Sequence, residues 1–245
     1  MTNIFKTGLV LSIVLVLTGM LGLSGIANAA DLDFPESRGG TTNVEYGSGW
    51  YLRGHVGVSL GNSENQRFND GTNSYAFVPQ NEDNGYSSGV GFGYTFNPYL
   101  RMDATMDYHS GRDWQGLDAG AGITDDSSFV LTNYSLNGYL SLGNTLGISP
   151  YIGAGLGVAD VKWGNHVISG VVGTRDGASY QGMTYSVMAG FDYRLDKNWL
   201  LDFEYKYTHV DGGKTVADNA VSSNTANSDD FKLQDIRIGL RYEIW

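Results

Sequence analysis

The sequence predicts an all-β protein, an eight-stranded antiparallel up-and-down transmembrane β-barrel. Three observations lead to this prediction. The chain begins with a secretion signal, apolar and polar side chains alternate in about eight stretches from Trp50 onward, and the connections between these stretches alternate in length. Alternation with period two is the signature of a strand, and each stretch approaches the roughly 9–11 residues that a tilted strand needs to cross a bilayer.

The N-terminal segment has the three parts of a signal peptide. Lys6 supplies the positive region, an apolar stretch follows, and an A-x-A cleavage site ends at Ala29. The apolar stretch is long enough to act as a membrane anchor, but glycine and hydroxyl residues interrupt it, which favours cleavage. The predicted organisation is a signal peptide at 1–29, a periplasmic leader at 30–48 and a barrel at 49–245.

Composition excludes several classes of protein. The formal net charge of −11 disfavours nucleic acid as a partner, and the absence of cysteine excludes disulfides and thiolate metal sites. No apolar run beyond the signal is long enough for a membrane helix. The 35 glycines and the many aromatic residues suit a barrel, which places rings at the two lipid interfaces and small residues where side chains crowd inside.

Each predicted strand has one apolar and one polar face. In the first strand, for example, Leu52 and Val56 alternate with Arg53 and His55. A soluble sandwich also alternates, but here aromatic rings gather near the ends of the apolar faces, where the girdles of a membrane barrel belong. The predicted strands span residues 50–60, 89–96, 100–108, 134–142, 150–161, 184–195, 199–208 and 235–244.

The connections between the strands alternate short and long. Short turns in outer-membrane barrels face the periplasm and long loops face outward, and an even number of strands places both termini in the periplasm. We therefore predict a bacterial outer-membrane location with this orientation. The predicted short turns are 97–98, 143–147 and 196–198, and the long loops, rich in Asn, Ser, Asp and Gly, are 61–86, 109–127, 163–179 and 210–229.

The polar faces of the strands predict a charged lumen. Eight strands leave only enough room for side chains to fill the interior. The inward acidic and basic residues nearly balance, which favours an ion-paired plug because unpaired buried charges are costly. A narrow ion path lined by the same groups is the alternative. The predicted lumen network comprises Arg53, Arg101, Asp103, Asp107, Asp192, Arg194, Asp202, Glu204, Lys206, Asp235, Arg237, Arg241 and Glu243.

Many of the other acidic residues fall in the long loops. They suit divalent cations that bridge to lipopolysaccharide, or they simply keep the loops solvated. The second interpretation is favoured because the fixed carboxylate spacing of a calcium-binding loop is missing. These residues are Glu64, Asp70, Glu82, Asp83, Asp113, Asp118, Asp125, Asp126, Asp211, Asp218, Asp229 and Asp230.

Three histidines, His109, His166 and His209, lie on or beside the predicted long loops. Imidazole can ligate hemin iron, so they are candidates for a hemin site, although isolated histidines are more often incidental. His109 and Ser110 form the only adjacent pair that suggests hydrolysis, and no third member is apparent. We therefore predict no enzyme activity, no cofactor and no metal site.

Three segments resemble a known family: GWYLRG at 49–54, PYIGAGLG at 150–157 and IGLRY at 238–242. The chain is similar to the outer membrane β-barrel domain family, particularly to small alphaproteobacterial porin-like surface antigens and hemin-binding proteins, which are similar in fold to the OmpA transmembrane domain. The resemblance covers residues 49–245. It implies a role in envelope integrity and in contact with a host or environment, sometimes with porin-like or hemin-binding activity, and it brings no catalytic residues.

The C-terminus departs from the family pattern. Such proteins usually end on a lipid-facing aromatic residue that the outer-membrane assembly machinery recognises. Here the alternation points Tyr242 and Ile244 toward lipid and places Trp245 one residue out of phase. Either the last residue, Trp245, twists outward to face lipid, or Ile244 takes the place of the usual terminal aromatic residue.

The predicted function is a structural and surface role in the outer membrane with little or no channel conductance. A small porin, or a surface receptor for hemin or another ligand, is the alternative. The expected partners are outer-membrane lipid and lipopolysaccharide, the assembly machinery, and a host or environmental ligand bound by the loops.

Overall fold

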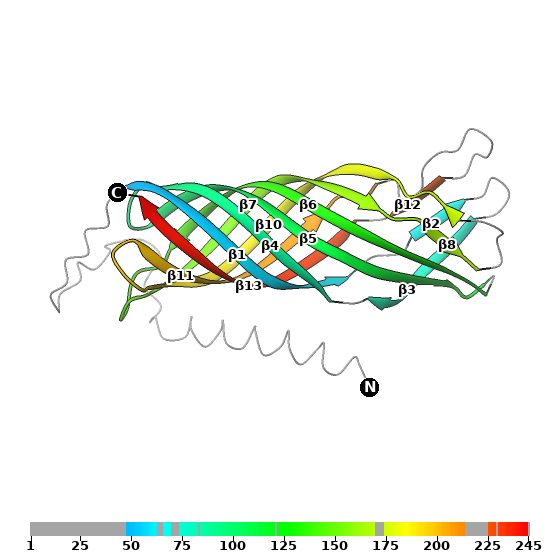
Figure 1. Cartoon of the computed structure of the whole chain (residues 1–245), viewed down its shortest axis with the longest axis horizontal. Helices are drawn as coiled ribbons and strands as arrows, with labels where there is room; N and C mark the ends of the chain where they lie inside the picture. The colour runs from blue at the N-terminus through cyan, green and yellow to red at the C-terminus, as the bar shows by residue number, and fades with distance from the viewer. Residues whose placement is uncertain are drawn as a thin grey trace, which may run out of the picture. The chain divides into compact units, whose positions relative to one another are not determined.

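In the computed structural model, antiparallel strands close into a β-barrel (Figure 1). The predicted signal peptide, nearly all of the leader and Trp245 lie outside the described residues. Within those residues, no helix is long and apolar enough to cross a membrane. The structure describes residues 48–62, 66–69, 74–82, 84–120, 122–169, 174–213, 225–228 and 230–244.

Eight of the described strands form the closed ring, and each pairs with the next one along the chain. The first and last strands then pair from Trp50 opposite Ile244 to Asn62 opposite Lys232, which closes the barrel. The predicted eight-stranded up-and-down barrel is thereby confirmed. The ring consists of β1 (Gly49–Asn62), β4 (Gly85–Thr95), β5 (Leu100–Asp118), β6 (Ile123–Ser141), β7 (Ile148–Trp163), β10 (Ser179–Arg194), β11 (Trp199–Val210) and β13 (Phe231–Ile244).

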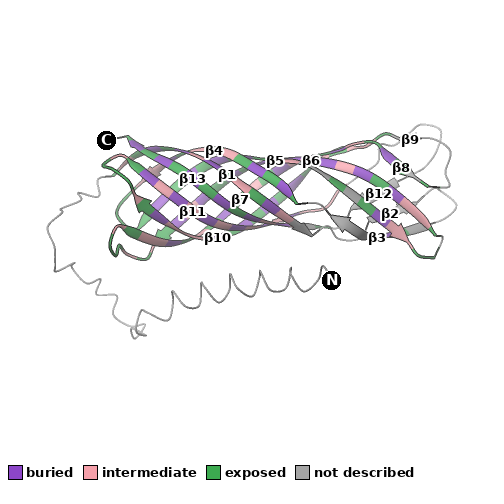
Figure 2. Ribbon diagram, turned by 60° about the horizontal axis from the view of Figure 1, so that its bottom comes forward, coloured by how far each residue is buried: buried purple, intermediate pink, exposed green. Residues whose placement is uncertain are grey.

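Buried and exposed residues alternate along the barrel strands (Figure 2). The outward positions carry large apolar side chains such as Val56, Val90, Leu136 and Leu156, all of which are exposed. The inward positions carry the charged residues. This inside-out distribution suits a barrel whose outer face meets hydrocarbon, because a water-soluble protein rarely exposes so large an apolar surface.

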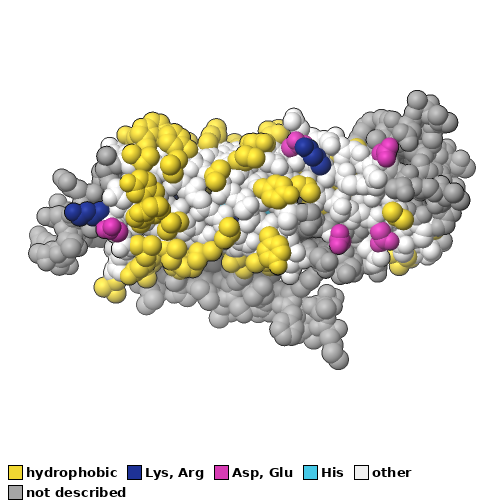
Figure 3. All heavy atoms as spheres, in the orientation of Figure 1, with side chains coloured by type: hydrophobic (Ala, Val, Ile, Leu, Met, Phe, Trp, Pro, Cys, Tyr) yellow, Lys and Arg dark blue, Asp and Glu magenta, His cyan; other side chains and the backbone are white. Residues whose placement is uncertain are grey.

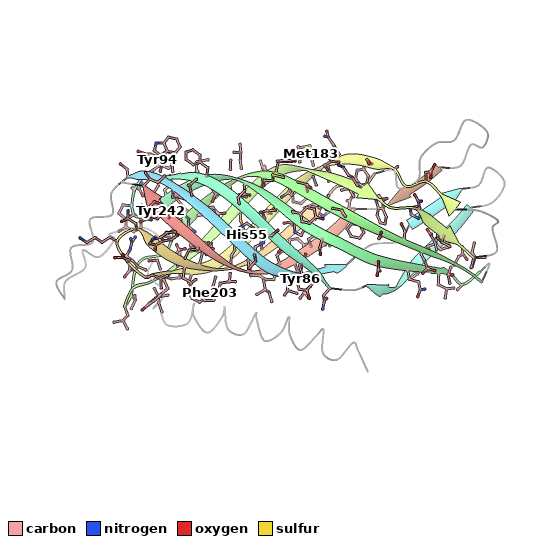
Figure 4. The ribbon with its side chains drawn as sticks, viewed as in Figure 1. His55, Tyr86, Tyr94, Met183, Phe203 and Tyr242 are labelled. Carbon is pink, nitrogen blue, oxygen red and sulfur yellow. The ribbon has the colours of Figure 1, made fainter. Side chains whose placement is uncertain are left out.

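The two ends of the barrel differ. At the turn end, β1 begins, β13 ends and the short turns lie; the loop end is opposite. Rings pack against one another on the outer surface at the turn end, where Trp50 stacks on Phe92 with centroids 4.7 Å apart and Trp199 contacts Tyr242 at 4.8 Å. Figure 4 shows Tyr242 near this end and Tyr86 farther along the barrel.

Two strands continue far beyond their predicted ends. The predicted loop at 109–127 is wrong: β5 reaches Asp118, β6 begins at Ile123, and the Gly122 N–H donates to the Asp118 carbonyl at 2.8 Å between them. A register irregularity between His109 and Arg112 marks where the extension begins. Alternation is visible in the sequence only where one face meets lipid, and a strand with water near both faces loses that signal.

The other long connections also contain strands. In the described residues these are β2 (Gln66–Asn69), β3 (Ser74–Glu82), β8 (His166–Ile168), β9 (Thr174–Arg175) and β12 (Thr225–Ser228). β3 pairs with the extension of β5, β2 lies between β3 and β12, and β8 joins β6 to β9. We call these five strands, together with residues 112–118 and 123–129, the loop-end platform.

Candidate functional site in the barrel lumen

Two layers of side chains fill the lumen. An ionic network occupies the turn end and the middle, and an apolar cluster occupies the loop end. All of the predicted lumen charges except Arg194 are buried, and Arg194 lies partly exposed at the turn end. The contacts of each layer determine what can pass through the barrel.

At the turn end, Asp192 of β10 lies between two arginines. Arg101 of β5 donates to one of its carboxylate oxygens at 2.9 Å, and Arg241 of β13 donates to both oxygens at 3.0 and 3.2 Å. Beside them, Arg194 pairs with Glu243 at 3.1 Å. The bonds of Asp192 to Arg101 and Arg241 are charge-assisted and buried, and they hold strands from different sides of the barrel together.

In the middle of the lumen, Arg53 of β1 contacts three carboxylates. Its guanidinium nitrogens lie 3.3 Å from Asp103, 3.1 Å from Asp202 and 3.4 Å from Glu204. The same guanidinium donates to the Tyr139 hydroxyl at 2.8 Å. A guanidinium presents five donors in a fixed fork, so it can satisfy several buried acceptors at once.

Three buried tyrosines, Tyr51, Tyr139 and Tyr151, complete this middle layer and were not among the predicted site residues. Tyr51 donates to Asp103 at 3.1 Å and Tyr151 to Asp202 at 2.6 Å. The Arg101 guanidinium lies over the rings of Tyr139 and Tyr151, 4.5 and 4.3 Å from their centroids. Tyrosine occurs on both faces of such a barrel, so residue type alone did not identify them. Only their position on the inward face of their strands indicated that they lie in the lumen.

Toward the loop end, Asp107 of β5 accepts from Lys206 at 2.9 Å and from Arg237 at 3.4 Å. His55 lies 3.0 Å from its second oxygen. Arg237 in turn donates to Asp235 at 2.9 Å. Because Lys206 of β11 and Asp107 of β5 come from strands that are not neighbours in the sheet, their contact crosses the lumen.

Glycines of β4 create the space for these large inward side chains. The register places Gly93 opposite Tyr51, and Gly89 opposite His55. A Cβ on Gly89 would lie 2.6 Å from the His55 ring, and a Cβ on Gly93 would collide with the Tyr51 ring. β7 plays the same part, since a Cβ on Gly153 would lie 2.7 Å from the ring of Tyr139. The glycine-rich strands therefore face the bulkiest residues of their neighbours.

Beyond the ionic network, an apolar cluster fills the loop end of the lumen. Leu131 of β6 and Leu233 of β13 are each 1% exposed, and the rings of Phe129 and Trp163 lie 4.9 Å apart. Phe77 comes from β3, so the cluster also anchors the platform. Sequence reasoning missed this cluster because most of its members lie at or beyond the predicted strand ends. The cluster comprises Phe77, Phe129, Leu131, Ala159, Val161, Trp163, Val210 and Leu233.

The structure does not bring the three candidate hemin ligands together. His109 points into the lumen from β5, 3.1 Å from Asp235, and does not lie in a loop. His166 is buried in the platform 2.9 Å from Asp125, and His209 lies in the outward phase of β11, where it stacks on Tyr185.

The adjacent His109 and Ser110 do not form a catalytic pair. They project from opposite faces of β5, with His109 buried in the lumen. The Ser110 hydroxyl accepts the backbone N–H of Tyr86 at 2.9 Å on the other face. Successive side chains of a strand point in opposite directions, so adjacency in the sequence keeps this serine and this histidine apart.

On the face shown in Figure 3, several acidic side chains lie toward the loop end, and most of the apolar side chains lie over the rest of the barrel. The predicted loop carboxylates differ in exposure. Asp113, Asp126 and Asp230 are exposed, whereas Asp125 is buried against His166. Asp118 and Asp211 are partly exposed. The side chains of Glu64, Asp70, Glu82, Asp83, Asp218 and Asp229 lie outside the described part of the structure.

Comparison with known proteins identifies the family. Residues 20–243 match the model described as outer membrane protein beta-barrel domain. The chain belongs to this family. The outer membrane protein PagN of Salmonella typhimurium is 29% identical, with 79% of this chain and 89% of PagN covered. A putative adhesin of Rickettsia felis is 24% identical, with 82% and 90% covered.

Among solved structures, the outer membrane protein OprG of Pseudomonas aeruginosa has a similar fold. Its TM-score is 0.52 at 15% sequence identity, with 81% of this chain and 97% of OprG covered. At this identity the likeness concerns the fold alone. The family, its relatives and the fold agree that this chain is an outer-membrane β-barrel protein of bacteria.

Proposed function

We propose that this protein is a closed, non-conducting barrel that gives the outer membrane a rigid surface platform. The observation that carries the proposal is the apolar cluster stacked on the ionic network. Leu131, Val161 and Leu233 close the loop end of a lumen whose middle is filled by paired charges such as Lys206 and Asp107.

The two layers act as barriers in series. An ion entering from the turn end meets carboxylates and cations that already neutralise one another, so displacing a partner leaves a buried charge unpaired. An ion entering from the loop end meets an apolar constriction, which excludes water and therefore hydrated ions. This arrangement argues against the small-porin alternative, because a porin needs a continuous aqueous path.

The orientation that we propose places the turn end and both termini in the periplasm and the platform outside the cell. Short periplasmic turns and long outer connections are typical of outer-membrane barrels. The lipid-facing Tyr242 and Ile244 at the end of β13 would then be available to the assembly machinery, and the loop-end outer surface would meet lipopolysaccharide.

The platform is the part of the protein that we propose makes contact with a host or environmental surface. From His109 to Asp118, β5 runs on the order of 30 Å at about 3.3 Å per residue, far enough to project from the bilayer. Burial of Phe77 in the lumen cluster fixes β3 and makes the platform rigid. The name of the Rickettsia felis relative, a putative adhesin, supports a contact role. The separated histidines favour neither hemin binding nor catalysis.

Single-channel recording in planar bilayers tests the closed lumen. The refolded full chain is expected to give no steady conductance steps, whereas a variant that opens both layers, R101Q/R237Q combined with L131S/L233S, is expected to conduct. The same Leu→Ser change at Leu200, which is buried at the turn end outside the apolar cluster, serves as the matched control and should stay silent.

Insertion of every variant is verified by its shifted gel mobility before and after boiling, so that silence reflects a closed barrel. Steady steps from the unaltered chain that disappear in R101Q or R237Q would overturn the plug and support a small porin. A silent four-residue variant that is properly inserted would also count against the proposed barriers.

A further inference from the structure

Three metal-ligating side chains meet on the outer surface of the loop end, away from the lumen. His209 is near the end of β11, Asp211 follows that strand, and Asp230 precedes β13. One ligand atom from each lies within 4.8 Å of the other two. The lumen network uses none of the three.

The sheet register explains why residues distant in sequence meet here. Val210 of β11 pairs with Phe231 of β13, so the next positions, Asp211 and Asp230, lie opposite each other. His209 shares the face of Asp211, since residues two apart in a strand point the same way. The juxtaposition is therefore built by the barrel strands and not by a loop alone.

The distances fit a small cation. His209 Nε2 lies 3.3 Å from an Asp230 oxygen and 3.7 Å from an Asp211 oxygen. Ligand bonds of 2.0–2.1 Å in a tetrahedral zinc site place donor atoms about 3.3 Å apart. Small rotations of the two aspartate side chains, which are 48% and 53% exposed, would complete that geometry.

Neighbouring contacts hold the ligands in place. The Gly212 N–H donates to the second oxygen of Asp230 at 2.9 Å, and the Asp211 N–H donates to the Met183 carbonyl at 3.0 Å. The His209 ring stacks on Tyr185 with centroids 4.4 Å apart. Such outer contacts orient ligands and raise metal affinity, as they do in known metal sites.

We propose that His209, Asp211 and Asp230 bind one divalent transition-metal cation, for which Zn²⁺ is the probe. The imidazole distinguishes this set from an ordinary group of surface carboxylates, because imidazole ligands suit Zn²⁺ and its neighbours whereas carboxylates alone suit Mg²⁺ and Ca²⁺. Three protein ligands leave one position open, as in sites where the metal takes an exogenous oxygen ligand. The proposal revises the sequence-based expectation of no metal site.

The test is Zn²⁺ titration by calorimetry of the untagged, chelator-treated full chain in detergent micelles. We expect one saturable Zn²⁺ per chain and an affinity at least tenfold weaker in H209A, D211N or D230N. D126N and D176N, which remove one exposed carboxylate elsewhere, are matched controls and should bind like the unaltered chain. Heat-modifiable gel mobility verifies that each variant is folded.

Three results would overturn the proposal. Zn²⁺ binding that is unchanged in H209A and D230N would place the metal elsewhere. Tighter binding of Ca²⁺ than of Zn²⁺, insensitive to H209A, would indicate a carboxylate surface only. Absence of saturable binding would mean that His209 only contacts the two aspartates and holds no metal.

Discussion

Replacing Asp107 with Asn tests the ionic network most directly. Asp107 is completely buried and contacts Lys206, Arg237 and His55. The substitution keeps the shape of the side chain but removes its charge. Arg237 keeps a partner, because Asp235 lies 2.9 Å away, whereas Lys206 loses the carboxylate that it contacts at 2.9 Å.

The expected cost follows from this difference. Lys206 is 1% exposed, so in the D107N variant its ammonium group stays buried without the carboxylate that it contacts directly. Breaking a buried pair by removing one partner costs about 3–5 kcal/mol. In the double variant D107N/K206M the unpaired charge is gone. The double variant should therefore cost less than the two single variants together by about 2–3 kcal/mol, which is toward the upper end of the interaction energies of residues in contact.

Urea unfolding of the chain refolded into lipid vesicles measures these costs through the fluorescence of its 5 tryptophans. At an unchanged slope, a shift of the midpoint reports the change in the free energy of unfolding. D126N, which removes an exposed carboxylate from β6, is the matched control and should shift the midpoint by less than about 0.5 kcal/mol.

Two results would refute this reasoning. If D107N costs less than about 1 kcal/mol, water reaches Lys206 and the lumen is not closed around it. If the costs of D107N and K206M simply add, the two residues do not interact in the membrane, and the cross-lumen contact does not stabilise the barrel.

Three further predictions concern packing, orientation and the platform. G93A should destabilise the barrel by about 1–3 kcal/mol because its Cβ collides with Tyr51, while G138A, whose Cβ meets nothing within 4 Å, should be nearly neutral in the same urea assay. Because the chain has no cysteine, D126C should react with an impermeant maleimide on intact cells and N144C only after permeabilisation; the reverse pattern would invert the proposed orientation. Hydrogen exchange should find residues 114–117 protected, since they pair with β3 on one side and β6 on the other, and rapid exchange there would contradict a rigid platform.

The sequence predicted the membrane-facing half of this structure well. Every second residue of a barrel strand faces lipid and must be apolar, so the sequence shows that Leu136 and Val56 point outward. The charged residues between such positions must then point inward. The partners of those charges were not predictable. Lys206 and Asp107 lie on strands that are not neighbours, and the stagger that brings them together depends on how the whole barrel closes.

The loop end was the least predictable part, for a related reason. Beyond the bilayer no solvent imposes a two-residue period, so β5 looked like a loop from His109 onward although its backbone keeps pairing to Asp118. His109 was misplaced by the same error, because it falls into the inward phase once the strand continues. Leu131 lay between a predicted loop and a predicted strand. Without the strand register, the sequence could not show whether its side chain points into the lumen or outward.

The apolar cluster joins the two parts of the proposed function. Leu131, Val161 and Leu233 come from the membrane strands and Phe77 from the platform, yet they pack into one core. Under this proposal, a single set of contacts closes the lumen and fixes the platform above it. Opening a channel through this end would require moving Phe77 and hence β3, so in this architecture a permanently rigid surface and an open pore exclude each other.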